Sequence, residues 1–319
     1  MVAVATAGML TLIWCVSSLW LGPRIGYVDQ PDDLALKAHL APTVPLGGVG
    51  IFLGVHVGLA VLDEFDPWLL LASGVVLALG LFDDRFGVSP VVRLGVEAVA
   101  AVVLVTLATE VDGVAAFLLG TALVILSINA VNLFDGLDGL VGAAGLVTAL
   151  GIAWLSELRG GSGGFGALLA AALGGFLILN WHRARVFLGD NGSYVVGMLL
   201  AYGILQAAEE GTTAELITGG ALLGLFVIDV IVTLLRRALN RRPLFQGDRS
   251  HLYDQVRDRG ISVPGVAVIA GLLQAALVLL VLAMDRLVGD YPGVLLLSAL
   301  GVVLIGLSAV GGFLRVDAR

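Results

Sequence analysis

The sequence predicts an all-α integral membrane protein, built as a bundle of about eleven transmembrane helices. Of its 319 residues, 59% are hydrophobic and only 13% are charged, whereas soluble domains usually carry about 25% charged residues. Long apolar runs recur along the chain, and the basic residues gather in every second connection between these runs. Together these observations exclude an ordinary soluble fold.

The apolar runs have the length of helices that cross a bilayer. About 20 apolar residues span roughly 30 Å of hydrocarbon, and a helix satisfies its backbone hydrogen bonds internally. The predicted spans are residues 3–22, 46–62, 67–82, 91–109, 113–131, 139–157, 164–181, 192–208, 214–235, 261–284 and 292–314. The third is short and contains glycine. Because no repeat or linker interrupts the series, we expect residues 1–319 to form one domain.

The basic residues predict the orientation of the bundle. With the N-terminus outside, fifteen of the 17 lysine and arginine residues fall on the inner connections or near the C-terminus, which leaves Arg159 and Arg286 outside. Positive residues collect on the cytoplasmic loops of membrane proteins. We therefore expect a plasma-membrane protein with a cytoplasmic C-terminus. The net charge of −8 gives no reason to expect a nucleic acid partner.

Acidic residues recur where predicted spans end on the inner face. A carboxylate in this position is costly unless it binds a cation, pairs with a base or reaches water. Asp83 and Asp84 follow the third span, and a divalent cation or an arginine would relieve their mutual repulsion. Taken alone, the pair is more simply interpreted as a solvated helix end.

A second polar group follows the fifth span. Asn129 and Asn132 are three residues apart and share a helix face. Asp135 and Asp138 come next, each followed by a glycine that lets the chain turn closely around a ligand. The two carboxylates are suitable acceptors for a metal, a base edge or a ribose.

Two further groups complete the inner face. Asp190 precedes the eighth span, where backbone N–H groups could meet phosphate oxygens while the carboxylate holds an ion. A plain N-cap by Asp190 or Ser193 is the alternative. His251 lies in the basic connection 236–260, whose arginines would either clamp phosphates or anchor lipid headgroups.

These groups favour phosphoryl transfer, which needs positioned substrates and neutralised charge rather than a nucleophilic side chain. The single cysteine, Cys15, lies inside an apolar run, and no Ser-His-Asp or Cys-His arrangement is evident. Oxygen ligands without cysteine favour Mg²⁺, with Mn²⁺ as a substitute, over Zn²⁺.

Five motifs occur in a fixed order across about residues 24–260. They are Lys37-Ala-His39 with Pro45-Leu-Gly47-Gly48, Asp83-Asp84, Asn129-x-x-Asn132-x-x-Asp135-Gly-Leu-Asp138-Gly, Phe187-x-Gly189-Asp190-x-Gly192-Ser193 and Asp248-Arg249-x-His251. In this combination the chain resembles the polyprenyl-phosphate N-acetylhexosamine-1-phosphate transferases, which are glycosyltransferase family 4 enzymes of the MraY, WecA and TagO type.

The resemblance implies a reaction. An N-acetylhexosamine 1-phosphate, first of all GlcNAc 1-phosphate, would pass from a UDP-sugar to a polyprenyl phosphate of the undecaprenyl type, with release of UMP. This would be the first membrane step of cell-envelope glycan synthesis, with the active site facing the cytoplasm. Direct attack by the lipid phosphate is favoured over a covalent aspartyl intermediate, because the acceptor is already an oxyanion.

The resemblance also implies roles for individual residues. Catalysis would involve Asp83, Asp84, Asp190 and His251, and Asp190 and Asp84 would bind Mg²⁺. Substrate binding would involve Lys37, Asn129, Asn132, Asp135, Asp138, Asn180, Phe187 and Arg249. The expected partners are the UDP-sugar, the polyprenyl phosphate and the membrane, and a homodimer is left open.

One departure from the family pattern bears on the substrate. Members with the full pattern carry several histidines in the last inner loop, whereas here Tyr253 and Asp254 occupy that region and only His251 is present. This argues against a muramoyl-pentapeptide substrate and leaves the sugar open.

Three other functions are alternatives for such a membrane protein. An ion-coupled transporter predicts an inverted repeat, which the sequence lacks. A CDP-alcohol phosphotransferase needs an Ala-Arg pair and two further aspartates, which residues 139–157 lack. A phosphotransferase that uses another nucleotide-activated donor stays open.

Two further acids lie inside predicted spans. Asp229 lies about two helical turns inside the ninth span, where it would line a lipid-phosphate groove or pair with an arginine. Glu97 is expected to pair with Arg93, four residues earlier on the same helix.

Overall fold

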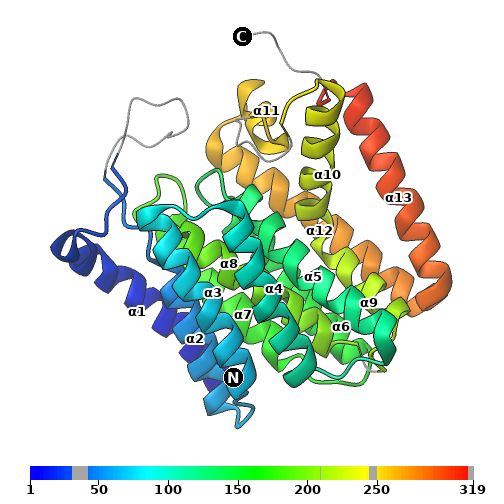
Figure 1. The fold of residues 1–319 in the computed structure, drawn as a ribbon, viewed down its shortest axis with the longest axis horizontal. Helices are drawn as coiled ribbons and strands as arrows, with labels where there is room; N and C mark the ends of the chain where they lie inside the picture. Colours follow the sequence, from blue (N-terminus) through cyan, green and yellow to red (C-terminus); the bar gives the residue numbers. More distant parts are fainter. Residues whose placement is uncertain (31–41, 209, 244–249, 315–319) are drawn as a thin grey trace.

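The computed structural model describes residues 1–30, 42–208, 210–243 and 250–314, and within these ranges the protein is a bundle of helices (Figure 1). The helices are α1 (Val2–Ile25), α2 (Gly47–Val61), α3 (Pro67–Phe86), α4 (Pro90–Leu107), α5 (Gly113–Phe134), α6 (Leu140–Leu158), α7 (Gly164–Asn180), α8 (Gly189–Gln206), α9 (Thr213–Gly220), α10 (Gly224–Leu239), α11 (Leu252–Asp258), α12 (Val263–Val288) and α13 (Asp290–Val310), with a 3-10 turn at Ala221–Leu223. Figure 1 shows α1 and α2 on one side of the bundle and α13 on the other.

The helices follow the predicted spans closely. Each predicted span overlaps a helix, and the ninth consists of α9, the 3-10 turn and α10 in succession. Six helical stretches within the described residues are long and apolar enough to cross a membrane. The predicted all-α, polytopic membrane class is therefore confirmed. The short helix α11, inside the connection 236–260, was not predicted.

Local sequence signals set several helix starts. The Asp66 side chain caps α3 by accepting the N–H groups of Trp68 and Leu69, and Ser89 and Ser262 cap α4 and α12 in the same way. Such caps satisfy backbone donors that have no partner in the first helical turn. In contrast, no side-chain cap hydrogen bond comes from the N-cap residue of α8, which is Leu188.

Helix α8 lies at the centre of the bundle. Every residue from Asn191 to Leu205 is buried, although α8 carries several polar groups near its start. Glycines allow its neighbours to approach closely: a methyl group added at Gly80 of α3 would lie only 2.3 Å from the Cα atom of Asn191, and one at Gly48 of α2 only 2.2 Å from that of Gly192. Small residues permit such backbone contact between membrane helices.

This packing makes α3 sensitive to side-chain size at one glycine. We expect Gly80→Ala to push α3 from the start of α8 and to lower the free energy of unfolding by about 1–3 kcal/mol, as overpacking does in other cores. Gly74→Ala on the same helix is the control, since the nearest atom to its added methyl group would be 3.9 Å away. Thermal unfolding of the two purified variants measures the difference. Equal midpoints would contradict the inferred close packing.

Candidate active site

Three of the predicted polar groups meet at one end of the bundle. They come from the C-terminal end of α3, the C-terminal end of α5 and the N-terminal end of α8. Asn132 of α5 donates from Nδ2 to Asp190 Oδ1 over 2.7 Å, and the backbone N–H of Asp190 donates to Asp84 Oδ1 over 2.8 Å. The structure therefore brings together segments that lie more than a hundred residues apart in sequence.

Asp84 caps α8 from another helix. Its Oδ1 accepts the N–H of Asp190, and its Oδ2 accepts both the backbone N–H of Asn191, over 3.2 Å, and the Asn191 side-chain amide, over 2.7 Å. The Tyr27 hydroxyl also donates to Oδ2, over 3.3 Å. A carboxylate is favourable here because the helix dipole and the unpaired N–H groups attract negative charge.

This arrangement corrects one expectation and leaves another untested. The first amides of α8 were expected to meet phosphate oxygens, or to be capped by Asp190 or Ser193, but two of them donate to Asp84 instead. Asp84 was also expected to bind Mg²⁺. Its oxygens accept hydrogen bonds that hold α8, and through α8 they position Asp190; its role as a Mg²⁺ ligand stays a prediction.

Asp83 ties three helices together. The Tyr194 hydroxyl of α8 donates to Asp83 Oδ2 over 2.6 Å, and the backbone N–H of Val88 donates to Oδ1 over 2.6 Å. Arg93 of α4 donates to the Tyr194 hydroxyl over 3.0 Å and lies 3.6 Å from Asp83 Oδ2. These partners hold Asp83 at the edge of the site, and its catalytic role stays a prediction.

Asp190 has one carboxylate oxygen left for a ligand. Asn132 holds its Oδ1 and also donates to the Ser193 hydroxyl over 3.0 Å. Within the described part of the chain, Asp190 Oδ2 accepts no hydrogen bond. A rigidly held carboxylate with one unused oxygen is well suited to bind a cation.

The carboxylates around Asp190 repel one another. Burial, followed by the negative charges of Asp190, Asp84 and Asp138, raises the pKa of Asp135 to about 8. Crowded acids of this kind are relieved when a cation binds among them.

The donor set fits Mg²⁺ in a particular way. Among the described residues, no three acidic, histidine or cysteine side chains converge tightly enough to enclose a metal ion. Mg²⁺ is usually bound by only one or two carboxylates, together with water and substrate phosphates, and not by an all-protein cage. Asp190 therefore fits as a single protein ligand for Mg²⁺ that arrives with a diphosphate.

Other predicted binding residues serve the fold as well. Asn180 accepts the backbone N–H of Gly139 at Oδ1 and donates to the carbonyl of Val186, each over 2.9 Å. Asp138 accepts the backbone N–H of Ala184 over 3.1 Å. Both side chains thus hold the connection before α8 against the one after α5. Direct contact between either residue and a substrate stays a prediction.

The remaining predicted substrate residues fall into two groups. Phe187 belongs to the same connection, where its N–H donates to the carbonyl of Val44 and its carbonyl accepts the N–H of Gly47. Lys37 and Arg249 lie outside the described residues, so their predicted roles are untested.

Asn129 and Glu97 form a pair that was not expected. Asn129 Nδ2 donates to Glu97 Oε2 over 2.5 Å and to the carbonyl of Ile125 over 2.9 Å. The Glu97 side chain is fully buried, so this hydrogen bond compensates part of the cost of burying a carboxyl group. Arg93, the partner expected for Glu97, interacts with it through charge, and its hydrogen bond goes to Tyr194.

The last inner loop reaches the site through two aromatic rings. Tyr253 donates from its hydroxyl to the carbonyl of Leu133 over 3.1 Å, and its ring fills the space beside Gly136. His251 stacks on Tyr253 with ring centroids 5.3 Å apart. The tyrosine that departs from the family pattern therefore docks His251 against the end of α5.

The arginines of this connection divide into two pairs. Arg236 and Arg237 are 1% and 4% exposed, so burial excludes the headgroup-anchor role considered for them. Arg241 and Arg242 are exposed, as an anchor at a membrane surface would be.

Tyr194, Asn191 and Tyr27 contact the site but were not predicted from the sequence. Of these, Tyr194 could have been predicted. Tyr194 lies four residues after Asp190, on the same face of α8, and it follows the Gly192-Ser193 pair directly. Asn191 and Tyr27 gave no comparable signal, because their roles depend on contacts with Asp84, more than 50 residues away.

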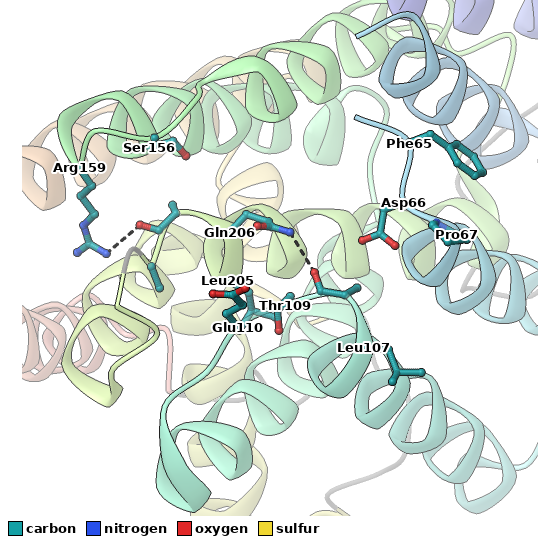
Figure 2. Close-up of a pocket in the computed structure, with 14 residues that line it drawn as sticks. Phe65, Asp66, Pro67, Leu107, Thr109, Glu110, Ser156, Arg159, Leu205 and Gln206 are labelled. Atoms are coloured by element: carbon teal, nitrogen blue, oxygen red, sulfur yellow. Dashed lines mark hydrogen bonds between the residues drawn. The ribbon is translucent and has the colours of Figure 1, made fainter. Parts of the chain in front are cut away.

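Two cavities lie outside this cluster. One, of about 420 Å³, is lined almost wholly by apolar side chains of α10, α11, α12 and α13, and it begins beside Phe134 and Tyr253. The other, of about 570 Å³, lies at the opposite end of the helices (Figure 2). There Arg159 and Gln206 donate to the carbonyls of Ala207 and Ala108, and no predicted site residue lines the cavity.

The fold and the site define a class: a helical membrane protein with a carboxylate cluster at one end of its bundle. Residues 67–208, which contain most of that cluster, match the family described as Glycosyl transferase family 4. A decaprenyl-phosphate N-acetylglucosaminephosphotransferase of Mycobacterium tuberculosis is 30% identical over 308 residues, an alignment that covers 81% of this chain and 75% of the relative.

Two further relatives are more distant. A probable undecaprenyl-phosphate N-acetylglucosaminyl 1-phosphate transferase of Bacillus subtilis is 28% identical, with 75% of this chain and 72% of the relative covered. An undecaprenyl-phosphate alpha-N-acetylglucosaminyl 1-phosphate transferase of Salmonella typhi is 28% identical, with 80% and 75% covered. The chain belongs to the polyprenyl-phosphate N-acetylhexosamine-1-phosphate transferases of glycosyltransferase family 4, as its motifs predict.

The cap formed by Asp84 can be tested through stability. Asp84→Asn places an amide group where backbone N–H groups need acceptors, and hydrogen bonds to a charged group contribute about 1.5–3 kcal/mol each. We expect a loss of at least that size in thermal or chemical unfolding. Asp112→Asn is the control, because Asp112 stands at the N-cap of α5 without a side-chain cap hydrogen bond. Equal stability of the two variants would contradict the cap.

Proposed function

We propose that this protein transfers GlcNAc 1-phosphate from UDP-GlcNAc to a polyprenyl phosphate of the undecaprenyl or decaprenyl type and releases UMP. The observation that carries the proposal is the geometry of Asp190, whose carboxylate is held by Asn132 with one oxygen unused, at a helix start anchored by Asp84. The names of the relatives supply the acceptor and the sugar as expectations for this chain.

The reaction follows from the charges of its participants. An oxygen of the lipid phosphate attacks the sugar-bound phosphorus of the donor, a new P–O–P linkage forms, and the bond to the UMP phosphate breaks. The acceptor is already an oxyanion, so the protein needs no base to activate it. Its task is to align two anionic substrates and to offset their repulsion.

The chain's own residues divide this task. Asp190, positioned by Asn132 and by the cap from Asp84, would hold Mg²⁺, which supplies positive charge to the diphosphate oxygens. Asp135 and Asp138 border the same cluster and are suitable acceptors for the nucleotide. His251, docked by Tyr253, would face the substrates from the last inner loop.

The placement in the membrane belongs to this proposal. We place eleven spans across the plasma membrane, with the N-terminus outside and the carboxylate cluster on the cytoplasmic side, where the UDP-sugar is available. The segregation of the basic residues supports this orientation. A homodimer is left open.

The apolar cavity offers a path for the lipid chain. It starts beside Phe134 and Tyr253, close to the polar cluster, and continues between α10, α12 and α13 past Leu273 and Leu304. A long hydrocarbon suits both its apolar lining and its start next to the proposed phosphate site. We therefore place the first isoprene units of the acceptor in this cavity.

The proposed reaction is tested by UMP release from purified protein with undecaprenyl phosphate, Mg²⁺ and a panel of UDP-sugars. We expect release with UDP-GlcNAc that requires both lipid and metal. Asp190→Asn should lower kcat at least about 100-fold, because a bound metal contributes several kcal/mol to transition-state stabilisation.

Asp112→Asn, far from the site, is the control and should keep its activity. The proposal would have to be withdrawn if folded protein that binds Mg²⁺ released no UMP with any UDP-sugar or polyprenyl phosphate.

The lipid path is tested by narrowing the cavity. Leu273→Trp should raise the KM for undecaprenyl phosphate about tenfold while the KM for UDP-GlcNAc stays unchanged, because the added ring fills space needed by the isoprene chain. Leu272→Trp is the matched control, since Leu272 is 66% exposed on the same helix and does not line the cavity. Equal effects of the two variants on the lipid KM would place the chain elsewhere.

A further inference from the structure

A buried acid and a histidine form a close pair beside the site. Asp229 of α10 is fully buried, and His251 is 4% exposed. His251 Nδ1 lies 2.6 Å from Asp229 Oδ2, and the backbone N–H of Leu252 donates to Asp229 Oδ1 over 2.8 Å. Neither role considered for Asp229, in a lipid groove or beside an arginine, describes this contact.

The two oxygens of Asp229 therefore face two different donors. The donor at Oδ1 is a backbone N–H, whose direction cannot be reversed. An ionised carboxylate accepts hydrogen bonds at both oxygens. With Asp229 ionised, Nδ1 of His251 carries the hydrogen in the contact with Oδ2. The Thr233 hydroxyl, 3.3 Å from Nδ1, lies on the same side of the ring.

If Nδ1 of His251 is held by Asp229, Nε2 is the ring nitrogen that remains available to a ligand. When one imidazole nitrogen is held by an orienting carboxylate, the other is the nitrogen that meets a ligand. The face of the ring is fixed as well, because His251 stacks on Tyr253 at an interplanar angle of 8°. Tyr253 in turn bonds to the end of α5, beside Asn132 and Asp135.

We propose that Asp229 is a positioning residue for His251. Its carboxylate accepts the Nδ1 hydrogen, fixes the orientation of the ring together with Tyr253, and leaves Nε2 for the substrates, where the imidazolium form would donate to a phosphate oxygen. The part that concerns the phosphate rests on the proposed function. The hydrogen on Nδ1 does not, and it can be measured without turnover.

The first test is ¹⁵N NMR of histidine-labelled protein in nanodiscs. The chain has four histidines, and the His251 signals are assigned by their loss in His251→Gln. We expect a hydrogen on Nδ1 of His251 in the unaltered protein. A ring with hydrogen on Nε2 alone would overturn the proposal, whatever the enzyme transfers.

The informative variant is Asp229→Asn. The backbone N–H of Leu252 requires an acceptor, so the amide oxygen should face Leu252 and the NH₂ group should face His251. Nδ1 must then accept, and the hydrogen moves to Nε2. We expect this change in the NMR spectrum of the folded variant, together with a 10- to 100-fold loss of kcat, as is typical when the partner of a functional histidine is removed.

A double-mutant cycle separates positioning from a general loss of stability. If Asp229 acts through His251, Asp229→Asn should cost less than about threefold in the His251→Gln background. Thr233→Val is the matched control: it alters a neighbour of Nδ1 but keeps the carboxylate, and it should change kcat less than about threefold.

An equal loss from Asp229→Asn in both backgrounds would overturn the positioning role. If Asp229→Asn does not fold, either alone or combined with His251→Gln, the NMR spectrum of the unaltered protein still shows whether Nδ1 carries a hydrogen. Absence of UMP release by the unaltered protein would count against the proposed function and leave the NMR result standing.

Discussion

The site depends on the contact between the Asp84 carboxylate and the N-terminal end of α8. This helix begins inside the bundle without a side-chain cap from its own N-cap residue, and unsatisfied N–H groups are expensive in such surroundings. Asp84 provides the missing acceptors from α3. Because Asp190 is itself one of the capped residues, the cap that stabilises the helix also fixes the carboxylate that is expected to bind the metal.

The same contact explains why two adjacent acids can have different surroundings. Asp84 turns toward the α8 backbone, whereas Asp83 turns toward Tyr194 and Arg93. Each acid therefore joins α3 to α8 by a separate route, and α4 is tied in through Arg93. Their repulsion is offset by helix amides on one side and by an arginine on the other.

The helices could be predicted from the sequence, because the length of an apolar run is a local property. The common location of the groups around Asp84, Asn132 and Asp190 could also be predicted, because all three follow or precede spans on the same side of the bundle. The hydrogen-bond partners of the site residues could not be predicted from the sequence. Asn129 and Asn132 share a helix face, yet Asn129 bonds to buried Glu97 and Asn132 bonds to Asp190. A difference of less than one helical turn selects the partner, and that choice depends on how α4 and α8 pack. Asp229 was noticed for the same local reason, but its histidine partner is contributed by a loop that spacing alone does not place.

Because Asp84 bonds to the first amides of α8, those amides are not available to bind a substrate phosphate. A helix N-terminus is a common anion site, but here two of its amides are already bonded to Asp84. The negative charge of two phosphorylated substrates must then be balanced by a cation and by basic or polar groups on the inner loops. This requirement explains the acidic cluster around Asp190, which attracts a cation, and it makes an oriented histidine in the last loop useful as a second contact. Recognition of phosphate and anchoring of the helix are thereby separated, so the substrates can leave without loosening α8.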